Sequence, residues 1–466
     1  MIVMKFGGTS VEDAQAIRRL VNLVRERLWQ QPVIVSSAMA KVTDTLLQAT
    51  STAASGNEPA TLELLERLES RHIATAHGLL RDCSQTEADI SALFAELRPL
   101  LSAICALREV TPRLSDRIAS FGERLATVLV SAALRESGVN AALIDARECI
   151  VTDDHFTCAA PLMDASNQRL SARLIPLLEA KRVPVLGGFI AATAQGQTTT
   201  LGRGGSDLTA ALVGGALDAE RVEIWTDVDG IRSTDPRLYG HTRHIESISF
   251  QEAAELAQLG AKVLHPSTLI PAMEKNIPVY VLNSRNPLHP GTCVRTECPG
   301  DDGVKAIAVK HGITLVQAST ARSFRPTGLA SEMFSFLEAD GCLPDIASIG
   351  QTSVTVTVDN KEVVARLTKQ FEKRVNIKAE NSKALISLVA EDIRQIVGLP
   401  VQVLLALDGI EVWMSSPGAS QRSFSFVISE KDVPEVVRRL HELLLEDNCS
   451  LLAANAEQSV AHAAVV

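Results

Sequence analysis

The sequence predicts an α/β protein: a three-layer α/β/α domain with a mainly parallel sheet, followed by two smaller α+β modules. Two observations carry this prediction. Residues 1–297 alternate short apolar runs with helical segments, a pattern typical of a parallel sheet with helices on both faces. After an acidic, turn-rich stretch at 297–303, the pattern changes to an internal repeat of strands and helices. A chain of 466 residues is long enough for two or three such domains.

The first part of the chain is expected to contain the functional edge of the sheet. Buried strands are predicted at 1–4, 33–35, 141–144, 184–186, 222–225 and 279–282, and helices at 14–28, 115–137, 167–180, 207–217 and 251–258. In such sheets ligands bind beyond the carboxyl ends of the strands. The glycines after Met4 and the small polar residues after Val35 fall at that edge, so we expect the site there.

The last third of the chain reads as two tandem βαββαβ units, similar to the ferredoxin-like fold. The first comprises strand 313–316, helix 331–339, strands 345–349 and 354–358 and helix 361–371; the second comprises strand 384–389, helix 399–407, strands 410–414 and 424–428 and helix 433–446. We expect domains at 1–297, 304–383 and 384–466, and leave open whether one module is threaded through the other. The alternative is two unrelated helix-and-hairpin segments. The Ala-rich tail 452–466 carries no functional signal.

Composition excludes several classes of partner and compartment. The formal net charge of −10 argues against nucleic acid as the main partner. The eight cysteines include no Cys-x-x-Cys pair, and we interpret them as reduced thiols of a cytoplasmic protein. The N-terminus does not resemble a signal peptide, and no run approaches the roughly 18 apolar residues of a membrane span. We therefore expect neither a structural metal nor a membrane partner.

The stretch Lys5-Phe6-Gly7-Gly8-Thr9-Ser10 joins a predicted strand to a predicted helix. This arrangement presents backbone N–H groups and one cation to an anion, for which phosphate is the obvious candidate. The alternative is a tight turn with a surface lysine.

A second polar stretch, residues 198–207, leads into an apolar helix. Arg203 lies among three glycines and could approach a carboxylate in a bidentate fork. Asp207 could either cap the helix or orient a neighbouring cation in a phosphate site.

A third stretch places Thr226 and Asp227 at the end of a strand, followed by Arg237 after a turn. A nucleotide could lie here, with Thr226 and Asp227 at its base or ribose and Arg237 at a phosphate. Lys262, after a helix and a glycine, could also reach it, whereas His265 reads as structural. The alternative for the stretch is a polar turn with a surface arginine.

Three further polar residues are candidates for a substrate pocket. Glu123 lies in a predicted helix among small neighbours, which leaves room for a ligand beside its carboxylate. Its alternative role is an ion pair with Arg124 or another cation. Ser37 and Thr43 supply hydroxyl groups after the strand at 33–35, or cap a helix.

Taken together, these strings resemble the aspartate kinases of the amino acid kinase family, and most of all their single-function, lysine-regulated bacterial members. The match runs in order through Lys5–Ser10, Thr198–Asp207, Trp225–Val228, Thr234–Arg237 and Gly260–Pro266, and ends in two modules similar to ACT domains. Glutamate, acetylglutamate and uridylate kinases share the fold but not this set. The sequence has neither a P-loop nor the protein-kinase motifs.

The resemblance implies transfer of the ATP γ-phosphoryl group to the side-chain carboxylate of L-aspartate, which gives 4-phospho-L-aspartate for lysine, threonine and methionine biosynthesis. That carboxylate, with a reference pKa of about 3.9, is already ionised, so no general base is required. By the resemblance, Lys5 meets the transferring phosphoryl group and Asp207 organises it. Further implied contacts are backbone N–H groups of Gly7 and Gly8 on phosphates, Arg203 on the substrate α-carboxylate, Glu123 on its α-ammonium, Ser37 and Thr43 in the aspartate pocket, and Thr226, Asp227, Arg237 and Lys262 on ATP. Arg232 departs from the family, which often carries Tyr at this position; it could stack on or hydrogen-bond the nucleotide, or point outward. Mg²⁺ would bind through the nucleotide.

The first ACT-like module departs from the lysine-regulated pattern. Where those enzymes carry Thr-Ser-Glu, this chain has Gly350 and Gln351 at the Ser-like and Glu-like positions, and Leu343-Pro344 replaces a Ser-Val pair. An effector ammonium loses a charge partner, so we expect weak or altered lysine inhibition. The implied effector residues are Ser323, Gly328, Asp345, Gly350 and Gln351, and a homodimer through the ACT modules is expected. The competing hypotheses are a kinase of another amino acid on this fold and an ACT-type sensor.

Overall fold

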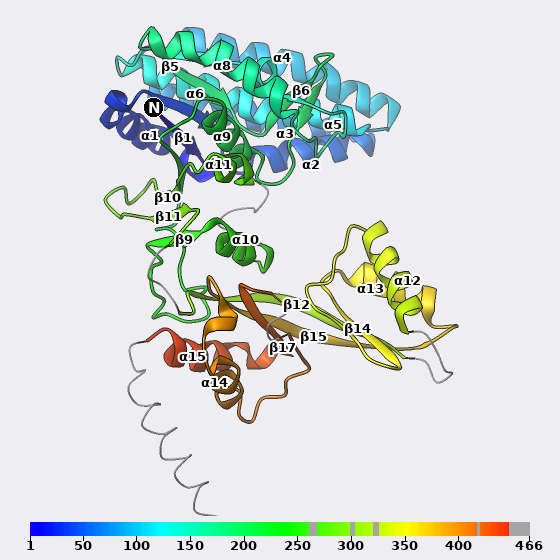
Figure 1. Cartoon of the computed structure of the whole chain (residues 1–466). Helices are drawn as coiled ribbons and strands as arrows, with labels where there is room; N and C mark the ends of the chain where they lie inside the picture. The colour runs from blue at the N-terminus through cyan, green and yellow to red at the C-terminus, as the bar shows by residue number, and fades with distance from the viewer. Residues whose placement is uncertain (261–267, 299–302, 320–325, 417–419, 447–466) are drawn as a thin grey trace, which may run out of the picture. The chain divides into compact units, whose positions relative to one another are not determined.

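The computed structural model describes residues 1–260, 268–298, 303–319, 326–416 and 420–446. The chain forms two compact units, each described by itself below (Figure 1). The first unit contains 1–231, 246–250 and 263–298; the second contains 232–245, 251–262 and 299–466. The two units therefore do not follow a single cut in the chain, because two short segments before residue 263 belong with the C-terminal part.

The first unit is organised around a sheet of eight strands, in the order β3-β5-β2-β1-β8-β10-β11-β9. Their bounds are β1 Ile2–Phe6, β2 Pro32–Ser36, β3 Ala141–Ile144, β5 Val183–Gly187, β8 Arg221–Thr226, β9 Ser247–Ser249, β10 Val279–Asn283 and β11 Thr292–Arg295. Neighbouring strands from β3 to β10 pair in parallel, and only the β10–β11 pair is antiparallel. The predicted mainly parallel sheet is confirmed.

Helices cover both faces of this sheet. Ile2, Met4 and Phe6 of β1 pack in one core with α1 and α6, whereas Val3 faces Gly214 of α9. Successive strand residues point to opposite faces, so α6 and α9 lie on opposite sides of β1. The helices of this unit are α1 Ala14–Glu26, α2 Val42–Ala54, α3 Glu58–Leu79, α4 Ser84–Leu107, α5 Pro112–Ala119, α6 Phe121–Glu136, α7 Ala146–Cys149, α8 Met163–Glu179, α9 Gly205–Ala216 and α11 Ile270–Glu274. Helix α10 (Phe250–Gln258) begins in the first unit and continues into the second.

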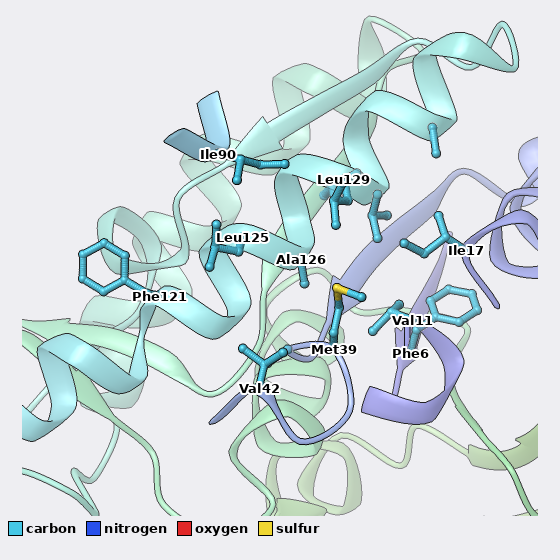
Figure 2. Packing of buried hydrophobic residues seen from close by; sticks show 14 of the residues in the cluster. Phe6, Val11, Ile17, Met39, Val42, Ile90, Phe121, Leu125, Ala126 and Leu129 are labelled. Atoms are coloured by element: carbon cyan, nitrogen blue, oxygen red, sulfur yellow. The ribbon is translucent and has the colours of Figure 1, made fainter. Parts of the chain in front are cut away.

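The core under α6 consists of aliphatic side chains with few aromatic rings, as the composition indicates. In Figure 2, Ala126 of α6 points toward Met39, and Leu125 and Leu129 of the same helix belong to the same core as Phe6. All five of these side chains are buried. This packing holds the carboxyl ends of β1 and β2 against α6, which is the helix that carries Glu123.

Two long helices, α3 and α4, occupy a stretch that the sequence analysis left unassigned. The predicted helix 115–137 is also wrong in detail, because it is two helices, α5 and α6, which meet at Ser120. The Ser120 hydroxyl donates to the carbonyl of Arg117 and competes with regular helical bonding at this point.

By length and composition, α4 could cross a membrane. In this fold one face of α4 belongs to the core: Ile90, Phe94, Leu97, Leu101 and Ile104 are all buried. Glu96, on the same helix, forms an ion pair with Arg124 of α6 at 2.7 Å. These contacts make α4 part of the helical layer.

A small sheet stands beside the main one. It pairs β4 (Val151–Thr152), β6 (Ile190–Thr193) and β7 (Thr198–Thr200) in the order β4-β6-β7. Because β7 ends where the glycine-rich stretch 201–207 begins, this sheet sets the position of that stretch.

The second unit contains one antiparallel sheet of six strands, in the order β13-β14-β12-β15-β17-β16. Its elements are β12 Ala306–Ser319, α12 Pro326–Ala339, β13 Ala347–Ile349, β14 Ser353–Val358, α13 Lys361–Phe371, β15 Asn376–Val389, α14 Leu399–Ala406, β16 Met414–Ser416, β17 Ser423–Ser429 and α15 Val433–Leu444. In Figure 1, α12 and α13 lie at one end of the long strands β12 and β15, and α14 and α15 lie at the other.

The two long strands serve two separate cores. Val316 and Ala318 of β12 pack with α12, α13 and β14, whereas Ile307 of the same strand packs with α14, α15 and β17. The register of β12 with β15 shifts between Lys310 and Leu315, where the two halves meet. The sequence analysis left the threading of the modules open; these pairings insert the module at 316–371 into one formed from 304–307 and 384–445.

Candidate active site

A cavity of about 390 Å³ lies where β1, β2 and β5 end. Because these strands are parallel, their carboxyl ends meet at one edge of the sheet. Among its lining residues are six of the predicted site residues: Lys5, Gly8, Ser37, Thr43, Glu123 and Asp207. They come from β1, the turn after it, the segment after β2, the first turn of α2, α6 and α9, so the tertiary fold brings together residues up to about 200 positions apart.

Lys5 and Asp207 form an ion pair inside this cavity. Lys5 Nζ lies 2.6 Å from Asp207 Oδ1, and both side chains are largely buried. Lys5 is the penultimate residue of β1, and Asp207 lies in the first turn of α9. Helix α9 begins after Gly204, which has a φ of 73°, and no side chain caps it. The Asp207 carboxylate therefore does not cap the helix; it faces the lysine. The pair stands beside a helix N-terminus, where anions are favoured.

Glu123 provides a buried carboxylate on another wall of the cavity. Its Oε1 accepts a hydrogen bond from the Ala38 N–H at 3.1 Å, and its Oε2 is buried without a hydrogen-bond partner among the described residues. Burial raises the pKa of Glu123 to about 8. Arg124, the partner considered in the sequence analysis, pairs with Glu96 instead. An unsatisfied buried acceptor in a cavity marks a place for a ligand with N–H donors.

The loop after β2 closes the cavity on a third side. The Gly8 carbonyl accepts from the Ala40 N–H at 3.1 Å, and a Cβ on Gly8 would lie 3.1 Å from the Ala38 carbonyl. This tight approach favours glycine at position 8, because a Cβ would make the Ala38 backbone shift. Ser37 and Thr43 flank the loop and line the cavity.

Gly7 does not have the backbone role that the sequence analysis expected. Its N–H donates to the Trp225 carbonyl at 2.9 Å, which continues the pairing of β1 with β8. That donor is therefore used within the sheet. Gly8, one residue further on, lines the cavity.

Arg203 is exposed and is not among the cavity-lining residues, although Gly202 and Gly204 on either side of it are. Within the described ranges no hydrogen bond or ion pair holds its guanidinium. Its assignment to the substrate α-carboxylate stays a prediction.

The residues predicted to hold the nucleotide fall in different parts of the chain. Thr226 ends β8 in the first unit, and its hydroxyl donates to exposed Asp227 at 3.2 Å. Arg232 and Arg237 belong to the second unit, where Arg232 donates to the Thr242 carbonyl and Arg237 pairs with Asp235 at 2.6 Å. Lys262 and His265 lie outside the described residues. A single nucleotide site built from these residues stays a prediction.

Sequence reasoning missed Asp116, a buried carboxylate of α5. Its Oδ2 accepts from the N–H groups of Thr157 and Thr200 at 2.8 and 3.0 Å, and its Oδ1 accepts from the Thr200 hydroxyl at 2.7 Å. Burial raises the pKa of Asp116, and these three hydrogen bonds oppose that rise. The carboxylate thus ties the strand before the glycine-rich stretch to the helix before the one that carries Glu123. No local motif marks this residue.

Further lining residues were also missed. Met39, Lys41, Asp44, Phe189 and Ser206 line the cavity. Phe189 has a φ of 65° and its N–H donates to the Thr209 hydroxyl of α9, so its place depends on a long-range contact. Asp44 and Ser206 lie next to residues that were predicted from the sequence, and this closeness in sequence was the one signal that could have identified them.

The predicted effector residues lie in the second unit, except Ser323, which is outside the described residues. Gly328 on α12 and Gly350 and Gln351 between β13 and β14 are exposed. Asp345 is engaged by Lys310 at 2.9 Å, and Lys310 also pairs with Asp359. The Asp345 carboxylate already has a cation as its partner.

The fold and the cavity define a class of protein: an α/β protein with a buried lysine–aspartate pair and a separate buried carboxylate in a cavity at the carboxyl edge of its parallel sheet. Comparisons with known proteins agree with this class. The model of the amino acid kinase family matches residues 1–283, and an ACT domain model matches residues 386–444. The chain is 34% identical to the lysine-sensitive aspartokinase 3 of Escherichia coli over 96% of its own length and 99% of that protein. It is 33% identical to the chloroplastic aspartokinase 2 of Arabidopsis thaliana, over 95% of this chain and 84% of that one.

Solved structures give the same assignment. Escherichia coli aspartokinase III in complex with aspartate and ADP superposes with a TM-score of 0.83 at 33% identity, covering 96% of this chain and all of that one. The same enzyme with lysine and aspartate also gives 0.83, at 34% identity. The chain belongs to the amino acid kinase family and, within it, to the aspartokinases, which are ATP-dependent kinases of aspartate. The family predicted from the motifs is confirmed.

Proposed function

We propose that the cavity at the ends of β1, β2 and β5 is where the γ-phosphoryl group of ATP passes to the β-carboxylate of L-aspartate. The observation that carries this proposal is the Lys5–Asp207 pair, with Nζ and Oδ1 2.6 Å apart, at the functional edge of the sheet. Relatives with bound aspartate and ADP support the choice of ligands.

Lys5 neutralises charge on the phosphoryl group as it moves between the two substrates, and Asp207 holds the ammonium in place. In phosphoryl transfer, positioning and charge stabilisation supply most of the catalysis. The acceptor carboxylate is ionised at neutral pH, so the site needs no general base. The largely buried setting strengthens the electrostatic effect of Lys5 on the transferring group.

Glu123 binds the α-ammonium of aspartate through its unpartnered Oε2. Ser37 and Thr43 complete the aspartate pocket, and Arg203 binds the α-carboxylate. The support for Glu123 is its buried carboxylate in the cavity wall. Arg203 rests on its place between two glycines that line the cavity.

Gly8, Thr226 and Asp227 are the proposed ATP contacts within the first unit. Mg²⁺ would be carried mainly by nucleotide and water. The cavity fits an ion that the nucleotide carries, because Asp207 is paired with Lys5 and Glu123 is buried on another wall. When bound, the ion would supply charge neutralisation beside that of Lys5.

The second unit is proposed to be regulatory, and the enzyme to catalyse the first step of lysine, threonine and methionine biosynthesis in the cytoplasm. Its two ACT-like modules are 316–371 and the module formed from 304–307 and 384–445, with β12 and β15 shared between them, in place of the expected consecutive division into 304–383 and 384–466. A lysine-sensitive relative supports an amino-acid effector. The edge strands β13 and β16 offer unpaired backbone for a homodimer.

The test is an initial-rate assay with ATP and aspartate, compared with glutamate and acetylglutamate as acceptors. Aspartate should be phosphorylated at a rate that the other two acceptors do not approach. Equal rates with glutamate would contradict the assignment of the acceptor.

Loss of aspartate phosphorylation in Asp207→Asn, with ATP binding retained, would support the transfer role of the pair.

A further inference from the structure

A group of three metal-binding side chains lies outside the active-site cavity, at the junction of α3 and α4. His77 is in the last turn of α3, Cys83 is the N-cap residue of α4, and Glu87 is in the first turn of α4. One ligand atom from each residue lies within 4.8 Å of the other two. None of the three has a part in the proposed reaction.

The three side chains already contact one another. Cys83 Sγ lies 3.4 Å from His77 Nδ1 and 3.0 Å from Glu87 Oε1, and His77 Nε2 forms an ion pair with Glu87 Oε1 at 2.6 Å. Metal–ligand bonds of about 2.0–2.3 Å at tetrahedral angles separate ligand atoms by roughly 3.3–3.8 Å. Small side-chain rotations therefore suffice to place the three atoms around one ion.

We propose that Cys83, His77 and Glu87 bind a zinc-type divalent cation at the α3–α4 junction, with water in the fourth position. The chemistry of the donors selects the metal. A thiolate with an imidazole and a carboxylate suits Zn²⁺ or Co²⁺, whereas Mg²⁺ and Ca²⁺ require oxygen ligands.

Cys83 must lose its proton when the metal binds. The thiol now donates to Glu87, which raises the pKa of Cys83 through that hydrogen bond and its charge. Metal binding forms a metal–sulfur bond and releases the thiol proton to solvent, while Glu87 changes from hydrogen-bond acceptor to ligand. The balance is one proton released per metal bound when His77 is neutral.

The site is reachable and lies between two elements. The His77 side chain is 59% exposed and the Glu87 side chain is 34% exposed. Solvent therefore gives the metal a path to the ligands. Because the ligands come from consecutive helices, the ion fastens the end of α3 to the start of α4 and stabilises the folded chain in proportion to its binding.

The test is a cobalt titration of the full-length chain, without a histidine tag, with reduced thiols and with chelator removed. One equivalent of Co²⁺ should produce a thiolate-to-cobalt charge-transfer band, and Zn²⁺ should displace it. Cys83→Ser should abolish the band, and Glu87→Gln should weaken cobalt binding by more than about tenfold. Cys158→Ser, which removes an exposed thiol elsewhere, should leave the titration unchanged.

The proposal is overturned if excess Co²⁺ produces no band, if Cys83→Ser keeps it, or if Cys158→Ser removes it. Circular dichroism checks that each variant is folded. As an independent measurement, calorimetry in two buffers of different ionisation enthalpy should report one proton released per Zn²⁺ bound. Release of no proton would exclude Cys83 as a thiolate ligand.

Discussion

The Thr200 hydroxyl donates to Asp116 Oδ1 at 2.7 Å and links β7 to α5 across 84 positions of sequence. Thr200 is followed by the stretch whose residues 202 and 204–207 line the cavity, and α5 is followed by the helix that carries Glu123. One buried carboxylate thus sets the distance between the two walls that are proposed to hold aspartate.

Asp116→Asn should raise the KM for aspartate roughly tenfold and leave the KM for ATP within about twofold, because the amide cannot accept from all three donors. The measurement is steady-state kinetics with each substrate varied. Asp153→Asn is the matched control. Asp153 also accepts hydrogen bonds from backbone N–H groups, and it lies at an exposed place in the loop 153–160, which contains the Asp116 donor Thr157. Parallel rises in both KM values would show a general loss of structure instead of positioning.

Lys5→Ala should lower kcat by about a hundredfold or more, because it removes the cation that faces the transferring phosphoryl group. Thermal unfolding should change little, since β1 keeps its backbone pairing on both sides. Lys275→Ala, which breaks an exposed lysine–aspartate pair, provides the comparison. Near-normal turnover in Lys5→Ala would remove the lysine from the reaction.

The KM for aspartate should fall as pH rises from about 6.5 toward 8 and then level off, because Glu123 must be ionised to pair with an ammonium group. Glu123→Gln should have a higher KM that does not change over this range. A variant with the wild-type pH profile would exclude Glu123 as the titrating group.

The same carboxyl makes a second, independent prediction about stability. Its folded-state pKa of about 8 lies above the ordinary glutamate pKa of 4.5, so between these values the folded state binds the extra proton. Stability from this group is therefore lost as pH rises through that window. We therefore compare the melting temperatures of Glu123→Gln and wild type at two pH values. The difference, variant minus wild type, should be larger at pH 8 than at pH 5. An equal difference at both pH values would contradict the raised pKa.

Gln351→Glu should strengthen inhibition by lysine several-fold, because it offers an exposed carboxylate to the effector ammonium. The wild-type chain should show weak inhibition in the same assay. Gln370→Glu adds the same charge at an exposed position of α13 in the same module and should have no effect. Micromolar lysine inhibition of the wild type would show that Gln351 does not weaken the site.

Local patterns identified the residues that lie next to a strand end or a helix start. Lys5 and Asp207 belong to recognisable strings, and the parallel sheet that unites them was predicted from alternating apolar and helical segments. Asp116 and Phe189 had no such signal, because their importance arises from hydrogen bonds to residues distant in the chain. Gly7 shows the opposite case: its motif suggested a phosphate donor, but the neighbouring strand β8 takes its N–H.

The His77–Cys83–Glu87 group lies outside any pattern of paired cysteines. Its three side chains come together only because α3 ends and α4 begins at the right places. Neither helix was assigned from the sequence.

By itself, the sequence determined the fold class, the family and the charged residues that a phosphoryl-transfer site requires, because periodicity and short motifs encode local structure and local chemistry. Only the tertiary structure decided which of these groups meet. It paired Lys5 with Asp207, left Glu123 with an unsatisfied oxygen in the cavity wall, and threaded one module through the other. The physical reason is that ion pairs, burial and strand pairing depend on distances in space, which local sequence patterns do not contain.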